Sequence, residues 1–254
     1  MNGYLTTESV QNGPLVIAHR GASRAFRENT IAAFRGAAAL GADWVELDVR
    51  RTADRQVVVH HDATVALHDN EVAATLRLPL VELRRDQLPS EIPDLASALA
   101  ACEHLGVNVE IKSSRDAPDF DEEYWVCEAV VAALDRWDRS RLLVTSFDSG
   151  AIDRVRVLDP TVPTGWLTVQ VDDPGVVAER TASRGHVALN PWDPVVTPAV
   201  IAEAHAAGLV VNVWTVDDPK RIAELVTMGV DGIITNCPDV ARAVVDGLGA
   251  PNDE

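Results

Sequence analysis

One phrase recurs along the chain: a helical segment, then a glycine, then a β-rich run. Gly41, Gly106, Gly208 and Gly229 each stand at this junction, as in the runs GADWVELDV and GLVVNVWTV. A glycine just past a helix end typically adopts the left-handed cap conformation, and a strand soon after it makes a short helix–strand loop. The repeated phrase therefore predicts an α/β chain built from successive helix–strand units.

Counting these units gives eight strands separated by helical patterns, which favours a (β/α)₈ (TIM) barrel. A doubly wound open sheet is the alternative, but its first turn is usually a glycine-rich phosphate loop, and here that turn reads AHRGAS. We expect one domain over residues 14–249, with tails at 1–13 and 250–254. The predicted strands are 15–19, 44–49, 108–112, 142–147, 164–168, 186–190, 210–215 and 232–236. The predicted helices are 29–40, 93–105, 120–136, 149–158, 174–184, 197–207, 218–228 and 238–247.

One segment breaks the alternation of strand and helix. The run QVVVHHD (56–62) follows the second strand after a short polar turn, with no helix between, so we interpret it as a hairpin extension of that strand. Residues 63–92 show no strong period and contain Pro79 and Pro89. We therefore expect a short irregular insertion above the barrel.

Charge and hydropathy limit the partners. Lys and Arg number 22 and Asp and Glu 39, which gives a net charge of −17. Nucleic acids and anionic membranes are recognised by basic patches, so this balance argues against both. No apolar stretch reaches the ~18 residues of a membrane span and the first residues are polar, so we expect a cytoplasmic protein. The three cysteines lie far apart and are expected to be buried free thiols, which are Cys102, Cys127 and Cys237.

Ionisable residues gather at the carboxyl ends of the first three barrel strands, the end at which such barrels carry their active sites. Glu46 and Asp48 are two apart on a strand, so their side chains share one face, and Glu110 with Lys112 repeats the spacing. Clustered carboxylates inside a barrel are costly without a cation. All-oxygen ligands favour Mg²⁺ or Ca²⁺. In the alternative interpretation, Lys112 or Arg20 alone neutralises the carboxylates.

The same strand ends carry groups suited to phosphate esters. Arg20 and Lys112 beside a divalent cation are a typical set for phosphate oxygens, the alternative being a plain ion-pair network. Cleavage of a phosphodiester needs a base and an acid, and His19 with the pair His60–His61 offers them. In an extended run His60 and His61 face opposite ways, and periodicity does not decide which faces inward. The other four histidines are expected to be structural or solvent-exposed: His68, His104, His186 and His205.

Together, the motifs HRGASRAFRENTIAAF, ELDVRRTADRQVVVHHD, VEIK, VWTVDDP and GVDGIITNCPD resemble those of the glycerophosphodiester phosphodiesterase family. The resemblance spans about residues 15–247. It implies a metal-dependent barrel that cuts glycerophosphodiesters to sn-glycerol 3-phosphate and an alcohol, through attack by the substrate's own hydroxyl and a cyclic phosphate. By motif match it implies the following roles: His19 and His61 as acid and base, Glu46, Asp48 and Glu110 as metal ligands, Arg20 and Lys112 as phosphate ligands, Glu28 and Asn29 as supports of the site, with Asn29 or Thr30 as a helix cap, and Trp214 as a wall beside the glycerol.

Several alternatives stay open at this point. A lysophospholipid substrate would need an apolar rim near residues 63–92 or Trp192. An aldolase would need a Schiff-base lysine on a strand, for which Lys112 is the candidate, and a sugar isomerase would share the metal site. An inactive phosphate-binding barrel would be favoured by the loss of a histidine or a carboxylate, and all are present. The sequence leaves the alcohol, the choice of ion and the oligomeric state open; the turn at Arg55 and the phrase NPWDP differ from the family pattern.

Overall fold

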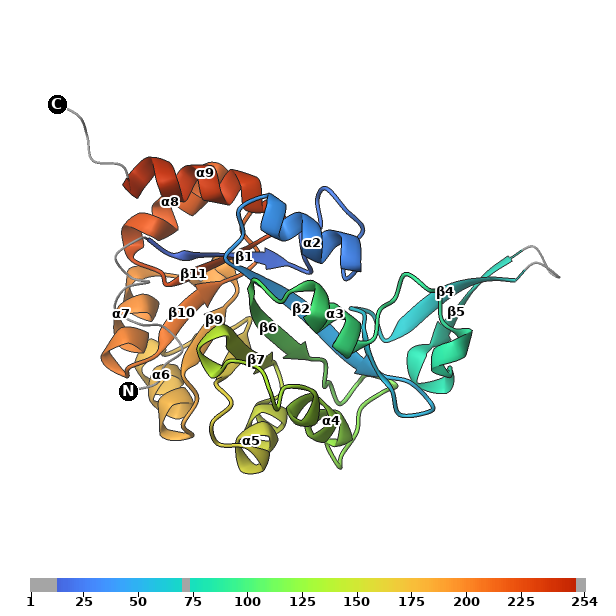
Figure 1. Ribbon diagram of the computed structural model, residues 1–254. Helices are drawn as coiled ribbons and strands as arrows, with labels where there is room; N and C mark the ends of the chain where they lie inside the picture. The colour runs from blue at the N-terminus through green and yellow to red at the C-terminus, as the bar shows by residue number, and fades with distance from the viewer. Residues whose placement is uncertain (1–12, 70–73, 250–254) are drawn as a thin grey trace.

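The computed structural model describes residues 13–69 and 74–249. Eight parallel strands close into a barrel and helices surround it (Figure 1). The ring closes because β1 pairs in parallel with both β2 and β11. The predicted (β/α)₈ fold is confirmed, whereas the predicted tails lie outside the described residues apart from Gly13. The barrel strands are β1 (Leu15–His19), β2 (Trp44–Arg51), β6 (Gly106–Ile111), β7 (Leu142–Ser146), β8 (Thr164–Thr168), β9 (Ala188–Pro191), β10 (Val210–Val213) and β11 (Gly232–Thr235).

Each helix begins at a local sequence signal. Asp or Thr side chains cap the first turn of most helices: Asp148, for example, accepts a hydrogen bond from Gly150 N at α5. Proline occupies the first turn of α6, α7 and α8, where its missing N–H costs nothing. No helix in the described part of the chain is long and apolar enough to cross a membrane. The helices are α2 (Ile31–Ala39), α3 (Leu95–Ala101), α4 (Trp125–Ala133), α5 (Ser149–Leu158), α6 (Pro174–Ser183), α7 (Pro198–Ala206), α8 (Pro219–Met228) and α9 (Pro238–Gly249).

The glycines of the recurring phrase have two different roles. Gly41, Gly208 and Gly229 have φ values of 80°, 78° and 84°, the left-handed conformation expected of a glycine that ends a helix. The same expectation is wrong for Gly106, which is the first residue of β6. A Cβ atom there would lie 2.1 Å from the Trp44 ring, so close packing inside the barrel requires glycine at this position.

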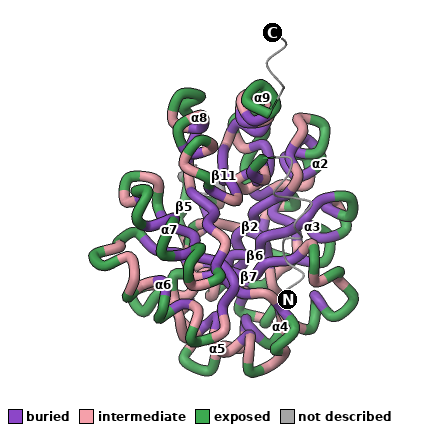
Figure 2. Tube along the Cα trace, turned by 90° about the vertical axis from the view of Figure 1, so that its left-hand side faces the viewer, coloured by how far each residue is buried: buried purple, intermediate pink, exposed green. Residues whose placement is uncertain are grey.

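The two faces of each barrel strand have different environments. Val45, Leu47 and Val49 on β2 pack outward in a hydrophobic cluster with residues of α2 and α3. Inside the barrel, Ile17 and Trp44 belong to an apolar cluster at the amino ends of the strands. The strands are buried and the outer helix surfaces exposed, as Figure 2 shows. The polar side chains two residues after Ile17 and Trp44 point to the same side of their strands, and they therefore lie next to this apolar cluster on the side of the carboxyl ends.

The segment after β2 contains more regular structure than the sequence indicates. β3 (Val57–Val59) pairs antiparallel with β2, as predicted. The expectation of an irregular insertion is wrong, because β4 (Thr64–Asp69) and β5 (Ala74–Pro79) form an antiparallel hairpin that projects from the barrel (Figure 1). Val65 faces Leu78 across it and Leu67 faces Leu76. Two apolar positions per strand give an alternation too short to stand out in a sequence.

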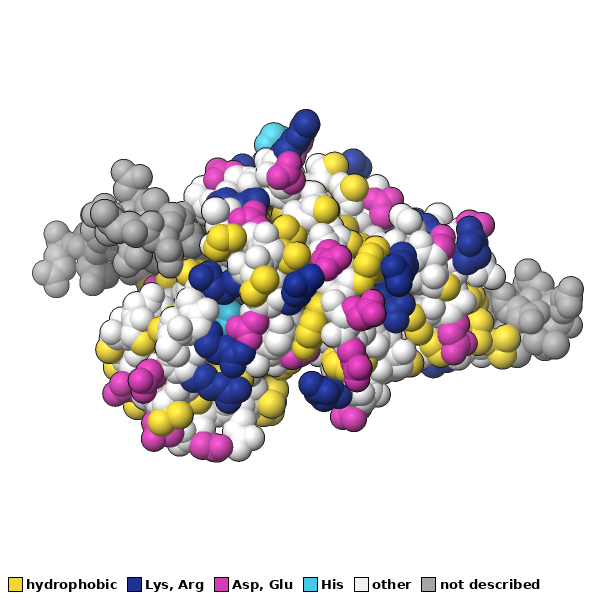
Figure 3. Space-filling model, turned by 90° about the horizontal axis from the view of Figure 1, so that it is seen from below, with side chains coloured by type: hydrophobic (Ala, Val, Ile, Leu, Met, Phe, Trp, Pro, Cys, Tyr) yellow, Lys and Arg dark blue, Asp and Glu magenta, His cyan; other side chains and the backbone are white. Residues whose placement is uncertain are grey.

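Charged side chains of both signs lie on the face of the molecule shown in Figure 3. Acidic and basic groups are interspersed there with hydrophobic side chains. The three cysteines are free and buried, as expected. Arg55, at the turn between β2 and β3, takes the left-handed conformation with φ of 55°. The turn therefore has the shape that glycine favours although its residue is arginine.

Candidate active site

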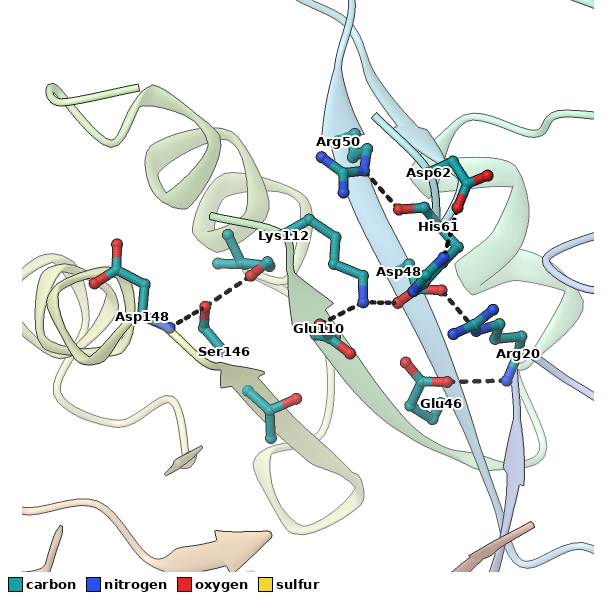
Figure 4. Close-up of polar contacts among 12 residues, drawn as sticks. Arg20, Glu46, Asp48, Arg50, His61, Asp62, Glu110, Lys112, Ser146 and Asp148 are labelled. Atoms are coloured by element: carbon teal, nitrogen blue, oxygen red, sulfur yellow. Dashed lines mark hydrogen bonds and ion pairs between the residues drawn. The ribbon is translucent and has the colours of Figure 1, made fainter. Parts of the chain in front are cut away.

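Strand register brings three carboxylates together at the carboxyl ends of β2 and β6. Asp48 and Glu110 are direct partners in the parallel pairing of these strands, and Glu46 precedes Asp48 by two residues on the same face. Carboxylate oxygens of the three residues lie within 4.8 Å of one another, and all three side chains are buried. Figure 4 shows them converging from the two strands. The cluster predicted from the sequence is therefore assembled by the fold.

Two cations partly neutralise this cluster. Lys112 Nζ lies 2.6 Å from Glu110 Oε1 and 2.9 Å from Asp48 Oδ1. Arg20 Nε lies 3.2 Å from Asp48 Oδ2, while its Nη1 pairs with Glu28. Two positive charges therefore lie among four carboxylates, the triad and Glu28. If Lys112 and Arg20 alone neutralised them, part of the negative charge would remain uncompensated.

The proton affinities of the carboxyl groups reflect this imbalance. Burial, together with the charges of Asp48 and Glu110, raises the pKa of Glu46 well above its usual value. Burial also raises the pKa of Glu110 to about 7, against the pull of Lys112. For Asp48 burial acts in the same direction, but Lys112 and Arg20 outweigh it and hold the pKa of this carboxyl below its usual range. Without a further cation, Glu46 and Glu110 therefore retain protons more readily than ordinary carboxyl groups.

The donor set fits a hard divalent cation. Glu46 Oε1 is buried and has no hydrogen-bond partner among the described residues, although Glu46 Oε2 accepts one from Arg20 N at 2.9 Å. An unpaired carboxylate oxygen in a buried site is costly, and a cation is the partner that would satisfy it. Glu46, Asp48 and Glu110 offer oxygen ligands alone, which suits Mg²⁺ or Ca²⁺ better than softer metals. The acidic triad is thus compatible with a divalent metal site.

The turn after β1 aims Arg20 back over the carboxylates. Arg20 has φ of 58°, a conformation that costs a non-glycine residue about 1–2 kcal/mol. Its N–H to Glu46 and its carbonyl, which accepts from Asn29 N at 2.9 Å, hold that conformation. Both Glu28 oxygens accept from Arg20 Nη1 at 3.0 Å. The strained turn therefore directs the guanidinium to the site.

Asn29 acts beneath the site rather than within it. Its Nδ2 donates to Asp48 Oδ2 at 2.8 Å, and only 3 % of the residue is exposed. Thr30, not Asn29, caps α2, because its hydroxyl accepts from Ala33 N. Asn29 therefore holds the Asp48 carboxylate in place.

The two candidate histidines are held through their Nδ1 atoms. His19 Nδ1 lies 2.8 Å from Asn236 Oδ1, and His61 Nδ1 lies 2.9 Å from Asp62 Oδ1. His60 turns instead toward the carbonyl of Thr64, 3.3 Å from its Nε2. Burial, with the neighbouring Arg20 or Lys112, lowers the pKa of both His19 and His61 below the ordinary value. Burial therefore favours the neutral form of each ring more than in an ordinary histidine. The contacts that hold the rings use Nδ1 and leave Nε2 out.

A single cavity collects most of the predicted site. Trp214 forms part of its wall, where its ring meets Phe147 edge-on with centroids 5.4 Å apart. The Trp214 indole N–H donates to Asn190 O at 2.8 Å, which fixes the ring. Asp48, Glu28 and Asn29 are not among the described residues that line the cavity. The lining residues are His19, Arg20, Glu46, His61, Asn108, Glu110, Lys112, Thr145, Phe147, Leu167, Trp214 and Ile234.

The structure adds residues that sequence reasoning missed. Arg50 Nε donates to the carbonyl of His61 at 2.7 Å (Figure 4), and its Nη1 pairs at 2.6 Å with the buried Asp119. Asp217 holds Asn236, the partner of His19, through two hydrogen bonds. Arg50 follows Asp48 by two residues and lies on the same face of β2. This spacing is the one feature of the sequence that could have indicated its place near the site. Asp119 and Asp217 lie in loops and give no periodic signal.

Other polar residues at strand ends and elsewhere are structural. Ser146 Oγ donates to Ile111 O at 2.7 Å and is buried between strands. His186 is buried and bonds Thr164 Oγ1 at 2.8 Å. The side chains of His104 and His205 are 88 % and 41 % exposed. These three histidines match the expectation, whereas the side chain of His68 lies outside the described part of the chain.

Known proteins are similar to this chain in sequence and in fold. The sequence pattern of the glycerophosphoryl diester phosphodiesterase family matches residues 19–240. A Mycobacterium tuberculosis protein named "Probable glycerophosphodiester phosphodiesterase 2" is 32% identical over 97% of both chains. A glycerophosphodiester phosphodiesterase of Caldanaerobacter subterraneus is 31% identical, over 89% of this chain and 95% of its own.

A solved structure supports the fold. A phosphodiesterase of Oleispira antarctica, in complex with the product sn-glycerol-3-phosphate, superposes with a TM-score of 0.81 at 23% identity and covers 94% of this chain and 99% of its own. The resemblance first seen in the motifs extends to the whole chain and its barrel. The chain therefore belongs to the glycerophosphoryl diester phosphodiesterase family.

Proposed function

We propose that the protein hydrolyses glycerophosphodiesters to sn-glycerol 3-phosphate and an alcohol with the help of a divalent cation. In this proposal Glu46, Asp48 and Glu110 hold the cation. His19 and His61 act as general acid and base, and Arg20 with Lys112 binds the phosphate. The cation, when bound, would supply positive charge for the phosphate oxygens.

One observation carries the proposal: two histidines, two carboxylates of the acidic triad, an arginine and a lysine line a single cavity. His19 and His61 line it together with Glu46, Glu110, Arg20 and Lys112. Neither serine nor cysteine is among the described lining residues. This composition favours general acid–base chemistry over an enzyme nucleophile of the serine or cysteine type.

The proposed reaction has two steps. One histidine takes the proton of the glycerol hydroxyl next to the phosphate, and the oxygen attacks phosphorus. The other histidine, which starts in its protonated form, gives a proton to the departing alkoxide, so that the alcohol leaves and a cyclic phosphate remains. The protonation states are now reversed, and the same pair passes a proton from water to the ring oxygen as water opens the cyclic ester. Arg20 and Lys112 hold the phosphate oxygens in both steps.

A product assay over a short panel of substrates tests this proposal. Glycerophosphocholine and glycerophosphoethanolamine should each release sn-glycerol 3-phosphate and an equal amount of the free alcohol. A coupled dehydrogenase assay measures the sn-glycerol 3-phosphate. His19→Ala and His61→Ala should abolish most of the release while the circular dichroism spectrum stays unchanged. Release at the wild-type rate by both variants would contradict the histidine roles.

A lysophospholipid substrate is the second candidate, because the mouth of the barrel has an apolar rim. Phe147, Val169 and Trp192 follow β7, β8 and β9, three neighbouring strands, and are 41 %, 53 % and 43 % exposed. The Phe147 ring contacts the Trp214 ring, and the backbone of Trp192 forms a β-bridge with the backbone of Trp214. If Trp214 walls the glycerol, an acyl chain carried by that glycerol would lie on this rim. Exposed apolar groups beside a polar site are typical of a binding surface.

Lysophosphatidylcholine distinguishes the two candidates. Cleavage at the same bond would give lysophosphatidic acid and choline, both of which mass spectrometry detects. Trp192→Ala should lower kcat/KM for lysophosphatidylcholine while leaving glycerophosphocholine unaffected. Val157→Ala, on an exposed position of α5, is the matched control. Failure to cleave lysophosphatidylcholine would remove the second candidate and leave the first intact.

A further inference from the structure

A chain of hydrogen bonds holds the ring of His19 where the barrel closes. Asn236 follows β11, the last strand, and its Oδ1 lies 2.8 Å from His19 Nδ1 on β1. Asp217, in the loop after β10, accepts from Asn236 Nδ2 at 2.7 Å and from Asn236 N at 2.8 Å. The ring of a residue on the first strand is thus fixed by residues that follow the last two.

The chemistry of these groups fixes which group donates and which accepts in each of these hydrogen bonds. A carboxylate can only accept hydrogen bonds, so the Asn236 amide must present its NH₂ to Asp217 and its oxygen to His19. Ser23 Oγ and Thr235 Oγ1 agree with this orientation: the first donates to Asn236 Oδ1 at 2.8 Å and the second to Asp217 Oδ1 at 3.0 Å. Because Asn236 Oδ1 is an acceptor, His19 Nδ1 must carry a hydrogen.

We propose that Asp217 and Asn236 are positioning residues that fix His19 as the Nδ1–H tautomer and leave the Nε2 lone pair for the substrate. The proposal rests on the proposed function, with His19 as the histidine that takes the proton of the glycerol hydroxyl. In the opposite tautomer Nε2 would carry the hydrogen and could not accept a proton from the glycerol hydroxyl. Neither Asp217 nor Asn236 is among the residues that line the cavity, so both act through His19.

Asp217→Asn is an isosteric change that tests whether the Asp217 carboxylate sets the direction of these hydrogen bonds. The new amide can donate as well as accept, so it no longer forces the Asn236 oxygen toward His19. We expect kcat for glycerophosphocholine to fall about 10-fold or more, because a histidine in the wrong tautomer is inactive. KM should stay within about 2-fold, because the cavity wall is unchanged. Asn236→Leu removes the acceptor altogether and should cost at least as much in kcat.

Asp218→Asn is the matched control. Asp218 is the neighbouring residue, its side chain caps α8 by accepting from Lys220 N, and asparagine caps a helix as well as aspartate does. The control removes the same charge from the same loop but leaves Asn236 untouched, so it should keep wild-type kcat. Equal kcat in Asp217→Asn and Asp218→Asn, with both folded, would overturn the proposal.

The tautomer itself can be read in the wild-type protein, whatever the variants do. In histidine labelled with ¹⁵N, the protonated nitrogen and the lone-pair nitrogen of a neutral ring resonate in separate regions. At about pH 8, where histidine is neutral, and with Mg²⁺ or Ca²⁺ present, His19 should show Nδ1 protonated. Its signals are those lost in His19→Gln. Protonation of Nε2 would overturn the proposal, whereas an absence of turnover with Nδ1 protonated would overturn the proposed function alone.

Discussion

The adjacent histidines His60 and His61 show how far a single residue can be assigned from a sequence. Alternation places them on opposite faces of an extended run but does not say which face is inward, and the resemblance selects His61. The structure has His61 in the cavity wall and His60 against the carbonyl of Thr64. The same-face placement of Glu46 and Asp48 needs only the two-residue period of a strand, so that prediction depends on no tertiary information.

Alanine substitutions separate the two histidines. His61→Ala should lower kcat by about 10²–10⁴-fold, because a general acid or base typically contributes that much. His60→Ala should leave kcat within a few-fold and cost some stability, because the half-buried ring loses its packing. The measurement is kcat for both variants with folding checked by circular dichroism. A dead His60→Ala beside an active His61→Ala would mean that the assignment is reversed.

Arg20 depends on two-pronged geometry, which lysine cannot reproduce. Its Nε faces Asp48 while its Nη1 faces Glu28. Arg20→Lys keeps the charge but cannot reach both carboxylates and a phosphate. We expect kcat/KM to fall at least ~10-fold, equivalent to about 1.4 kcal/mol. Arg27→Lys, an exposed arginine of the same loop, is the control; identical kinetics in the two variants would make Arg20 a structural ion-pair partner only.

Among the elements, the insertion was the hardest to predict. Helix ends marked by Gly41 and Gly229 follow from local backbone preference and were predicted correctly. The hairpin of β4 and β5 was missed because it buries little: Val65 is buried, but Leu76 is 41 % exposed. Its apolar partners come from segments further along the chain, such as Leu80 and Ile92, which share its hydrophobic cluster. A strand stabilised by distant residues leaves a weak period in its own sequence.

A buried ion pair joins β2 to the loop that follows Lys112. Arg50 and Asp119 are paired at 2.6 Å, with side chains 10 % and 3 % exposed. Asp119→Asn would leave the Arg50 charge buried without a carboxylate, so we expect the free energy of unfolding to fall by about 3 kcal/mol. Because Arg50 also holds the His61 carbonyl, kcat should fall as well.

Urea unfolding and kcat of three variants check this prediction. Asp116→Asn, an exposed residue of the same loop, should behave as wild type. Adding Arg50→Gln to Asp119→Asn should restore part of the stability, since the unpaired charge is gone. Full stability in Asp119→Asn alone would show that the pair is dispensable.

In the whole molecule, closure of the barrel creates contacts that no local pattern contains. Asn236 and His19 are 217 positions apart in the sequence and meet only because β11 pairs with β1. The count of eight helix–strand units predicts this closure, but the side chains that meet depend on the register between strands. For that reason the carboxylate cluster could be predicted, whereas the partners of His19 and Arg50 could not.

The stability of the barrel should fall in mild acid because of His186. Burial, with the charges of Arg156 and Arg184, lowers the pKa of His186 to about 4. In the unfolded chain the pKa is about 6.5, so the unfolded state takes up a proton first as the pH falls. Stability is therefore fully present above pH 6.5 and lost between about pH 6.5 and 4. Between pH 6.5 and 5 this amounts to at most about 2 kcal/mol.

Free energies of unfolding at about pH 7 and about pH 5 measure this loss. His186→Gln should lose less stability over this range than the wild type, by up to about 2 kcal/mol. His104→Gln, which changes an exposed histidine, should follow the wild type. Equal losses in His186→Gln and the wild type would mean that folding does not lower the pKa of His186.

The dependence of turnover on a divalent cation tests the central claim most directly. The rate of sn-glycerol 3-phosphate release from glycerophosphocholine is measured in untreated protein, after exhaustive chelation with EDTA, and after addition of excess Mg²⁺ or Ca²⁺. Chelation should abolish turnover and one of these ions should restore it, since three clustered carboxylates repel one another without a cation. Glu46→Gln should not regain activity at the same ion concentration. Full activity after chelation would contradict the metal site at Glu46, Asp48 and Glu110.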